Sequence, residues 1–297
     1  MLGGGYDSFV SKIQVFAAST TTVIASSMNP SVSGKPVTFR AVVSSVAGLP
    51  LGKIKYLHGT TLLAELTLID GSANYTTSTL PPGANIITAV YEGDSNFSAS
   101  TSAALNQFVL AATTTALSSS PNPSTYGQAV TFTAAVSSKL GQPPDGETVS
   151  FIKGTVLGTG ALSAGSTSLR TSTLPVGTSA IKAVYVGDSN FAGSSATLSE
   201  VINTATTATT LISSLNPSKV GQTVTFRASV RPRFSGKVTG NVTFYNGATA
   251  LKTVPLSVGI ATFTTSTLIH GAHSVKAIYH GSTNFKGSSA SLTQTVN

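Results

Sequence analysis

Cysteine and tryptophan are both absent from this chain of 297 residues. Without cysteine there is no disulfide, no thiolate nucleophile and no Cys-based metal site, so packing must hold the domains together. Charged residues are also scarce, at 9% of the chain, whereas they make up roughly 25% of a typical globular domain. Ser, Thr, Gly and Ala fill the gap, and residues such as Thr, Val, Ile and Tyr favour strands. The composition indicates a β-rich protein with a neutral, hydroxyl-rich surface.

Acidic residues are missing altogether from residues 206–297. The formal net charge is +8 at pH 7, and residues 20–109 and 110–205 each carry four cations and four anions. Residues 206–297 carry eight Lys or Arg residues and no Asp or Glu. The excess of positive charge therefore lies in the last third, which makes that region the candidate for contact with an anionic partner.

One stretch of seven residues recurs three times along the chain. It reads YEGDSNF at residues 91–97, YVGDSNF at 185–191 and YHGSTNF at 279–285, a spacing of 94 residues in both cases. A fixed period of this length means that one domain-sized unit is used three times.

Other motifs recur in the same register and predict the strands of each unit. A Thr-rich segment is followed by Asn-Pro-Ser, where proline marks the end of a strand and the preceding asparagine can satisfy a local turn. The next strand alternates apolar and polar residues, which is typical of a half-buried strand. Its phenylalanines, Phe39, Phe132 and Phe226, are the predicted core. Seven short strands per unit, separated by glycine turns, indicate a β-sandwich.

Catalytic and membrane-spanning signatures are missing. There is no Gly-x-Ser-x-Gly elbow, phosphate loop or dinucleotide fingerprint, and the nine acidic residues form no pair that recurs in register. No stretch approaches the roughly 20 apolar residues of a membrane span, and residues 1–19 lack the features of a signal peptide. We expect no enzyme activity and no cofactor, in a chain that is either intracellular or a downstream piece of a longer protein.

The order Thr-Thr-Thr, Asn-Pro-Ser, Val-Thr-Phe, Thr-Ser-Thr-Leu and the heptad resembles the bacterial immunoglobulin-like domain of group 3, over residues 20–297. The resemblance implies an all-β fold of three tandem immunoglobulin-like Greek-key β-sandwiches. Their expected ranges are 20–110, 111–204 and 205–297, called repeats 1, 2 and 3 below, with short linkers near Leu110–Ala112 and Asn203–Ala208. The resemblance also implies an extracellular or cell-surface location. The disulfide-on-tryptophan core of antibody domains is excluded by the composition.

Residues 1–19 do not follow the repeat and are expected to form a separate N-terminal segment. Residues 3–13 resemble the end of a bacterial β-propeller repeat, in which a glycine-rich turn leads into a Tyr-Asp-x-Phe-Val-x-Lys strand. The resemblance implies that a propeller domain lies upstream. The alternative is an ordinary leader strand.

The recurring heptad has two interpretations, a calcium loop or a structural clasp. Calcium requires six to eight oxygen ligands, usually with several carboxylates, and the third copy carries Ser282 in place of the aspartate. Because the flanking aromatic residues persist while the acid does not, we favour a clasp that joins two strands. The predicted clasp residues are Tyr91, Asp94, Phe97, Tyr185, Asp188, Phe191, Tyr279 and Phe285.

Three of the four histidines, His270, His273 and His280, lie in repeat 3. A zinc site needs three or four ligands that converge at about 2.0–2.3 Å. The extended segment between His273 and His280 separates them by roughly 20 Å or more, so we expect no metal site. We expect His270, His273 and His280 to be exposed turn residues.

The basic loop, residues 231–237, is the most distinctive non-repeated feature. Arginine suits two-point contact with phosphate or carboxylate, and loops at the ends of sandwich domains are common binding sites. The candidate residues for binding an anionic ligand are Arg227, Arg231, Arg233 and Lys237. The sequence does not identify the partner; a cell-surface or anionic polysaccharide is the candidate, and the alternative is a solvated basic loop without a binding role. Nucleic acid is disfavoured because no recognition helix or aromatic platform accompanies the charge.

Three hypotheses of function follow from the sequence. The first is a non-catalytic extracellular spacer or stalk, in which repetition adds length without chemistry. The second is an adhesive or anionic-glycan-binding module that acts through repeat 3. The third is an accessory region of a larger enzyme whose catalytic domain lies upstream.

Overall fold

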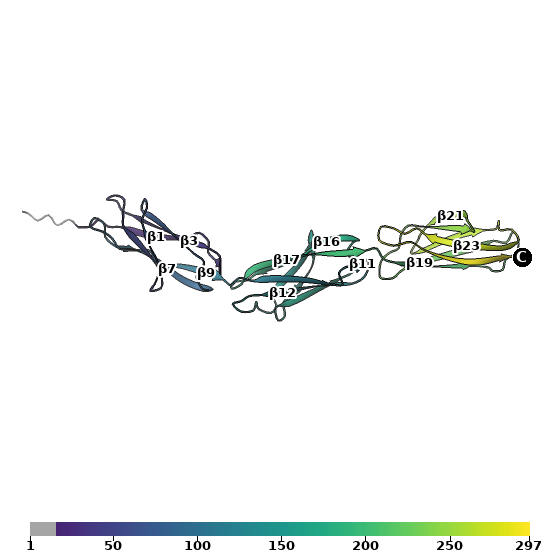
Figure 1. The fold of residues 1–297 in the computed structure, drawn as a ribbon, viewed down its shortest axis with the longest axis horizontal. Coiled ribbons are helices and arrows are strands. Elements are labelled where there is room, and N and C mark those ends of the chain that lie inside the picture. Colours follow the sequence, from purple (N-terminus) through teal and green to yellow (C-terminus); the bar gives the residue numbers. More distant parts are fainter. Residues whose placement is uncertain (1–15) are drawn as a thin grey trace, which may run out of the picture. The chain divides into compact units, whose positions relative to one another are not determined.

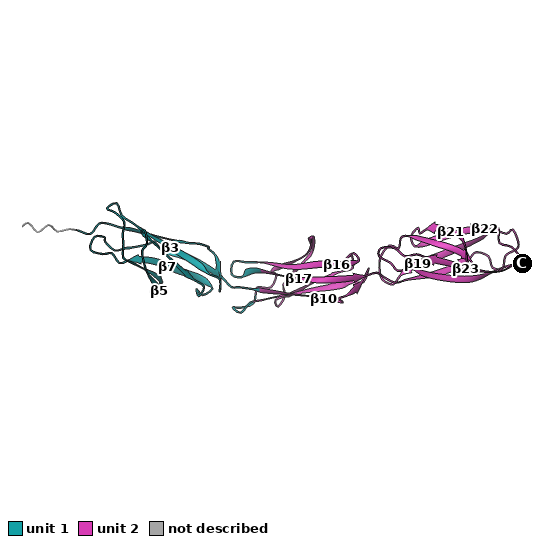
Figure 2. Cartoon of the chain, turned by 45° about the horizontal axis from the view of Figure 1, so that its top comes forward, with its two compact units in different colours: residues 1–113, 138–142, 187–193 teal, residues 114–137, 143–186, 194–297 magenta. Residues whose placement is uncertain are grey.

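The computed structural model describes residues 16–297, which are built from strands and contain no helix (Figure 1). The predicted all-β fold of three tandem Greek-key sandwiches is confirmed. The β-propeller resemblance rested on residues 3–13, which lie outside the described residues. Figure 2 colours two compact units, of which the second contains the whole of repeat 3 together with residues 114–137, 143–186 and 194–204 of repeat 2.

Repeat 1 is a sandwich of two sheets. One sheet has the strand order β1-β3-β6, and the other has the order β2-β9-β7-β4-β5, with β8 paired to β7. The short strand β2 runs parallel to β9, while the other pairs are antiparallel. The strands are β1 (Thr21–Ser26), β2 (Ser31–Val32), β3 (Val37–Ser44), β4 (Lys53–His58), β5 (Thr61–Thr67), β6 (Ser72–Thr77), β7 (Gly83–Tyr91), β8 (Ser100–Thr101) and β9 (Leu105–Leu110).

Repeats 2 and 3 follow the same plan. The sheets of repeat 2 have the orders β10-β12-β15 and β11-β17-β16-β13-β14, and those of repeat 3 have the orders β18-β19-β22 and β21-β20-β23-β24. The strands of repeat 2 are β10 (Thr114–Ser120), β11 (Ser124–Thr125), β12 (Val130–Ser137), β13 (Thr148–Lys153), β14 (Thr155–Ala161), β15 (Ser166–Thr171), β16 (Gly177–Gly187) and β17 (Ala192–Asn203). Those of repeat 3 are β18 (Thr207–Ser213), β19 (Val224–Pro232), β20 (Asn241–Asn246), β21 (Thr249–Pro255), β22 (Ile260–Thr265), β23 (Gly271–Tyr279) and β24 (Ser288–Val296).

The alternating strand that the sequence predicts contributes its inward face to the core of each repeat. On β3, alternate residues from Val37 to Val43 are buried, while the residues between them are partly or fully exposed. The strands β12 and β19 show the same alternation, and Phe39, Phe132 and Phe226 are each 0% exposed. This pattern arises because successive side chains of a strand point to opposite faces of the sheet.

Tyr56 in repeat 1 occupies a core position that phenylalanine fills in the other repeats. Its hydroxyl donates to Ala73 O at 2.6 Å and accepts from Ala41 N at 3.0 Å. Burial raises the pKa of the Tyr56 hydroxyl, because a phenolate would lose its hydration inside the sandwich. The corresponding residues, Phe151 and Phe244, are buried without a hydroxyl group.

The asparagine of each Asn-Pro-Ser motif reaches further than the predicted local turn. Asn29 Nδ2 donates to Asn106 O at 2.7 Å, and Asn29 Oδ1 accepts from Phe108 N at 2.9 Å. Asn122 and Asn216 make the same pair of bonds to the closing strands of their repeats. The local interpretation is therefore wrong. The amide group mimics a backbone peptide and fastens the opening of each repeat to its last strand.

Candidate functional site

The clasp of each repeat is its heptad, residues 91–97, 185–191 and 279–285. In repeat 1, Asp94 Oδ1 accepts hydrogen bonds from the amides of Asn96 at 2.7 Å and Phe97 at 2.9 Å. In repeat 2, Asp188 Oδ1 accepts the two corresponding bonds at 2.7 and 2.6 Å. A carboxylate oxygen that caps two amides in this way stabilises a tight turn.

The third clasp closes without an acid. The amide of Ser282 donates to Phe285 O at 2.9 Å, as the amides of Asp94 and Asp188 do in the other clasps. The first residue of each clasp is a tyrosine, and in repeats 1 and 3 its hydroxyl donates to a loop carbonyl. The distance from the hydroxyl oxygen to the carbonyl oxygen is 2.8 Å for Tyr91 and 2.7 Å for Tyr279. Burial, with a contribution from Asp94, raises the pKa of Tyr91.

Only glycine fits the third position of the clasp. Gly93, Gly187 and Gly281 have φ values of 79°, 84° and 86°, a left-handed region that other residues rarely adopt. A Cβ atom would lie 2.7, 2.5 and 2.8 Å, respectively, from a backbone oxygen across the turn. The close backbone approach explains why this glycine persists when the aspartate does not.

Each clasp also binds the chain segment that enters its repeat. Ala18, Ala111 and Ala205 form parallel bridges with Phe97, Phe191 and Phe285, respectively. Ala111 is 4% exposed and Ala205 is 0% exposed. A threonine two residues further along adds a side-chain bond to the same strand, and the three threonines are Thr20, Thr113 and Thr207. The segments predicted as linkers are therefore hydrogen bonded rather than free.

The histidines do not converge on one another. His273 Nε2 lies 2.7 Å from Ile269 O, and its Nδ1 lies 2.9 Å from Asn246 Nδ2. The expectation that His273 is an exposed turn residue is wrong, because it lies on β23 and is 9% exposed. His280 Nε2 lies 2.8 Å from Thr243 Oγ1. Within residues 16–297, no group of three or more His, Asp or Glu side chains could hold a metal ion.

A buried polar residue on each closing strand was missed by the sequence interpretation. Gln107 and Gln294 are each 0% exposed. The Nε2 of Gln107 donates to Met28 O at 2.9 Å, and that of Gln294 donates to Leu215 O at 2.9 Å. Their Oε1 atoms each accept from a serine hydroxyl at 2.6 Å. These amides tie the first and last strands of the repeat together through the interior.

Repeat 2 carries a carboxyl group at the corresponding position. Glu200 is 0% exposed. Its Oε1 accepts from Ser124 Oγ at 3.0 Å, but its Oε2 has no hydrogen-bond partner. A buried polar atom without a partner lowers the stability of a fold. The signal for this feature in the sequence is a polar residue at an inward position between two apolar ones, Leu198 and Ile202.

The four candidate cations of repeat 3 lie on β19, the middle strand of the sheet β18-β19-β22, and in the basic loop at its end. Arg227 and Arg231 are exposed residues of β19, and their strand partners on β18 are Ile212 and Ala208. Arg233 and Lys237 are exposed residues of the basic loop. The amide of Arg233 donates to Thr206 O at 3.0 Å, and its guanidinium carbon lies 5.3 Å from the centroid of the Phe234 ring.

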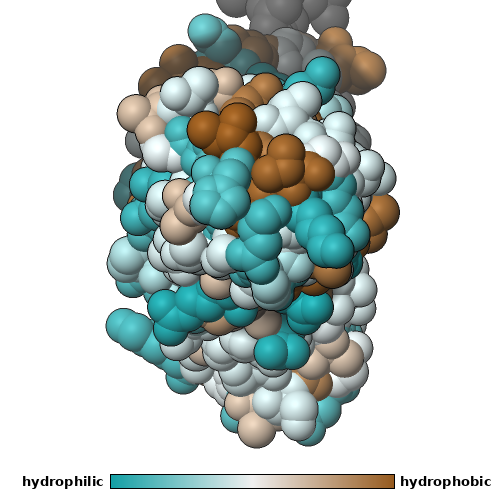
Figure 3. Space-filling view, turned by 90° about the vertical axis from the view of Figure 1, so that its right-hand side faces the viewer, coloured by the Kyte–Doolittle hydropathy of each residue, from teal (hydrophilic) through white to brown (hydrophobic). Residues whose placement is uncertain are grey.

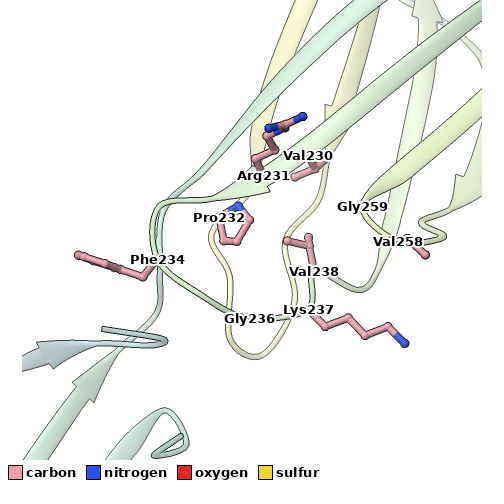
Figure 4. A pocket seen from close by; sticks show the side chains of 9 residues that line it. All are labelled: Val230, Arg231, Pro232, Phe234, Gly236, Lys237, Val238, Val258 and Gly259. Carbon is pink, nitrogen blue, oxygen red and sulfur yellow. The ribbon is translucent and has the colours of Figure 1, made fainter. Parts of the chain in front are cut away.

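A hollow of about 500 Å³ lies beside the basic loop and is lined in part by Arg231, Phe234 and Lys237. Figure 4 shows that the Arg231 guanidinium and the Lys237 ammonium point in different directions, while Phe234 points away from both. The structure therefore brings these cations onto one end of the sandwich without focusing them on a single point. Such an arrangement suits an extended polyanion better than a small anion.

The charged residues of repeat 1, in contrast, form pairs on the outer face of β4. Lys53 Nζ lies 2.5 Å from Glu65 Oε1, and Lys55 contacts Glu65 and Glu92. The hydrogen bond between them raises the pKa of Lys53 and lowers the pKa of Glu65. Exposed pairs of this kind add little stability. They involve four of the eight charged residues of repeat 1, namely Lys53, Lys55, Glu65 and Glu92.

The far end of repeat 3 carries single apolar side chains between polar ones (Figure 3). Val220 and Ile269 are 61% and 72% exposed. Scattered exposed apolar residues are normal on protein surfaces. Within residues 16–297, no helix is long and apolar enough to cross a membrane.

Among solved structures, the chain is similar to fibronectin(III)-like modules of CbhA from Clostridium thermocellum, with 20% identity, a TM-score of 0.36 and coverage of 61% of this chain and 94% of that one. It is also similar to the Escherichia coli adhesin FdeC (15% identity, TM-score 0.31, coverage 93% and 96%) and to the I9–I11 tandem of titin (12%, 0.36, coverage 92% and 99%).

A search of curated proteins found no match. The family model described as bacterial Ig-like domain (group 3) matches residues 23–110, 117–203 and 210–297. These three consecutive matches cover most of the chain, which therefore belongs to the bacterial Ig-like domain (group 3) family.

Proposed function

We propose that the chain is a non-catalytic spacer of a surface-exposed or secreted protein. The observation that carries this proposal is the bonding of the connecting residues. Ala111 N donates to Asn190 O at 2.8 Å, Ala112 N donates to Ser33 Oγ at 2.9 Å, and Ala205 N donates to Asn284 O at 2.9 Å. Connections whose peptide groups are fixed on both sides restrict bending, which a spacer requires and a flexible linker does not provide.

The same bonds support domain boundaries for the proposed spacer. We place the start of repeats 2 and 3 at Ala111 and Ala205, because each of these residues pairs with the clasp of the repeat that follows. The equivalent residue in repeat 1 is Ala18, whose amide donates to Asn96 O at 2.7 Å. On this basis repeat 1 begins two residues before the position expected from the sequence.

A spin-label experiment tests the spacer. Because the chain has no cysteine, the paired substitutions Thr61→Cys and Thr155→Cys label exposed, equivalent positions of repeats 1 and 2. We expect a narrow distance distribution in the otherwise native chain, and a distribution at least about twice as wide after four Gly or Ser residues are inserted behind Ala112, since such linkers are flexible. A native distribution as wide as that of the insertion variant would refute a spacer.

A second candidate function is binding of an anionic polysaccharide through repeat 3. The specific observation is the exposed set of Arg227, Arg231, Arg233 and Lys237 in a repeat without any acidic residue. This role, and the extracellular location of the protein, are proposals. In such a role the cations would act together along a polyanion, and the contact would weaken as salt screens the charges.

A pair of triple variants distinguishes this site from general charge. In the full chain, Arg231→Gln/Arg233→Gln/Lys237→Gln should weaken binding to a sulfated polysaccharide at least about tenfold, the effect of losing one charge-assisted contact. The matched control, Lys219→Gln/Lys252→Gln/Lys276→Gln, removes the same charge from exposed positions of the same repeat and should have a smaller effect. Equal losses in both variants, or no binding at about 0.15 M salt, would reject the site.

A further inference from the structure

Residues 123–127 of repeat 2, which comprise β11 and the turn that follows it, lie against repeat 3, and both belong to the same compact unit. The rings of Tyr126 and Phe285 meet edge to face, with centroids 5.3 Å apart and an interplanar angle of 89°. Ser235 Oγ in the basic loop donates to Gly127 O at 2.8 Å. Tyr126 is one of the side chains that pack against the hydrophobic core of repeat 3. An aromatic residue of one repeat thus extends the core of the next.

The two repeats approach each other closely at a glycine on either side of the contact. A Cβ atom on Gly127 would lie 1.9 Å from Ser235 O. A Cβ atom on Gly236 would lie 3.0 Å from ring atoms of both Tyr126 and Phe285. Both glycines have positive φ values, 77° and 132°, so a side chain would also strain the backbone. Gly34 and Gly221, the equivalents of Gly127, have the same φ of 77° with open space around them, so the glycine itself serves the turn and only the close approach to Ser235 is particular to this junction.

The equivalent positions in the other repeats lack this aromatic residue. Ser33 stands in the place of Tyr126 in repeat 1, and its hydroxyl accepts a bond from Ala112 N. Val220 stands there in repeat 3 and is 61% exposed. The basic loop is likewise found only in repeat 3. The contact therefore depends on residues that are particular to repeats 2 and 3.

The connecting segment between these repeats is held from both sides. Tyr126 N donates to Asn203 O at 2.8 Å on the side of repeat 2. On the side of repeat 3, Arg233 N donates to Thr206 O at 3.0 Å. Because the basic loop bonds to the connection through Arg233 and to the turn through Ser235, it bridges the two repeats on either side of the junction.

We propose that the turn after β11, which contains Tyr126 and Gly127, and the basic loop form an interlock that fixes repeat 3 on repeat 2. The interlock uses Tyr126, Ser235 and Gly236, whereas the charged groups of Arg231, Arg233 and Lys237 lie outside these contacts. The basic loop is therefore already in contact with repeat 2, through residues other than its charged ones. This inference goes beyond the proposed spacer function, since the interlock concerns a single junction and would hold in a chain with any other role.

Distance measurements between repeats 2 and 3 of the full chain test the interlock. The paired substitutions Thr155→Cys and Thr249→Cys place spin labels at exposed, equivalent positions that lie away from the contact. We expect a narrow distance distribution. Tyr126→Ala should widen it at least twofold, and Gly127→Val, which introduces a clash instead of removing a contact, should shift or widen it as well.

Two controls make the result specific. Val220→Ala truncates the equivalent residue of repeat 3, and Arg233→Gln/Lys237→Gln removes charge from the loop while keeping its backbone. Both should leave the width unchanged. Hydrogen exchange of the amides of β12 and β19 should remain native in every variant, which separates loss of the interlock from unfolding. An unchanged width in Tyr126→Ala and Gly127→Val, or a broad distribution in the unaltered chain, would overturn the proposal. The labels used for the spacer lie across the other junction, so the two tests can fail independently.

Discussion

Phe132→Ala is expected to unfold repeat 2 or bring it close to unfolding, while repeat 1 keeps its stability. Phe132 is 0% exposed and lies on β12 between the buried residues Val130 and Ala134. Truncating a buried phenylalanine to alanine lowers the free energy of unfolding by about 3–5 kcal/mol. A domain of this size holds roughly 5–13 kcal/mol in total. The substitution therefore removes a large share of the stability of one sandwich.

Hydrogen exchange monitored by mass spectrometry provides the measurement, because peptides report on each repeat separately. The amides of β12, β13 and β15 should lose protection, those of β3 and β4 should not, and those of repeat 3 should change only near its contact with Tyr126. The matched control is Val186→Ala, which truncates a side chain of the same repeat that is 74% exposed. Its effect should stay within about 0.5 kcal/mol. A uniform loss of protection in all three repeats would contradict independent cores.

Glu200→Gln is expected to stabilise repeat 2 by about 1–3 kcal/mol, the usual penalty of a buried polar atom without a partner. The side chains have nearly the same volume, so packing is preserved. At the equivalent position, the amides of Gln107 and Gln294 donate to backbone carbonyls through Nε2. The carboxyl group of Glu200 has no N–H group, and its Oε2 is unpaired. The amide would supply the missing N–H groups.

The reciprocal change, Gln294→Glu, is expected to destabilise repeat 3 by at least the same amount. It would place a carboxylate oxygen beside Leu215 O, where Nε2 now donates, and burial of an unpaired charge is unfavourable. Chemical denaturation, monitored by hydrogen exchange in the peptides of each repeat, measures both changes in stability. If Glu200→Gln lowered the stability of repeat 2, or if both changes were neutral, the buried amide would not be the source of stability that its geometry indicates.

The fold could be predicted because its information is local and periodic. The alternation around Phe39, Phe132 and Phe226 identifies inward faces without knowledge of any distant residue. The persistence of the heptad, despite the loss of its acid at Ser282, distinguishes a structural turn from a metal loop before any coordinates are known. Three copies of one domain allow such comparisons within a single chain.

The contacts that escaped prediction join residues far apart in the sequence. Asn29 bonds to Asn106 and Phe108 rather than to its own turn, and nothing in the motif Asn-Pro-Ser distinguishes the two outcomes. Gln107 could have been recognised, since it occupies an inward position next to Val109, but its partners could not. The interlock was hidden for a different reason. Tyr126 and Ser235 belong to two different repeats, and neither lies in a motif that predicts a contact between them. Only the structure of the junction brings them together.

Each clasp pairs with residues that precede it in the chain, and this order bears on folding during synthesis. Phe191 and Phe285 pair with Ala111 and Ala205, so each sandwich needs a short piece of chain that the ribosome has already delivered. None of the three clasps pairs with residues that follow its own repeat in the chain. Folding can therefore proceed one sandwich at a time from the N-terminal side, as is usual for multidomain chains. In that order, the core of each repeat can close before the synthesis of the next repeat is complete.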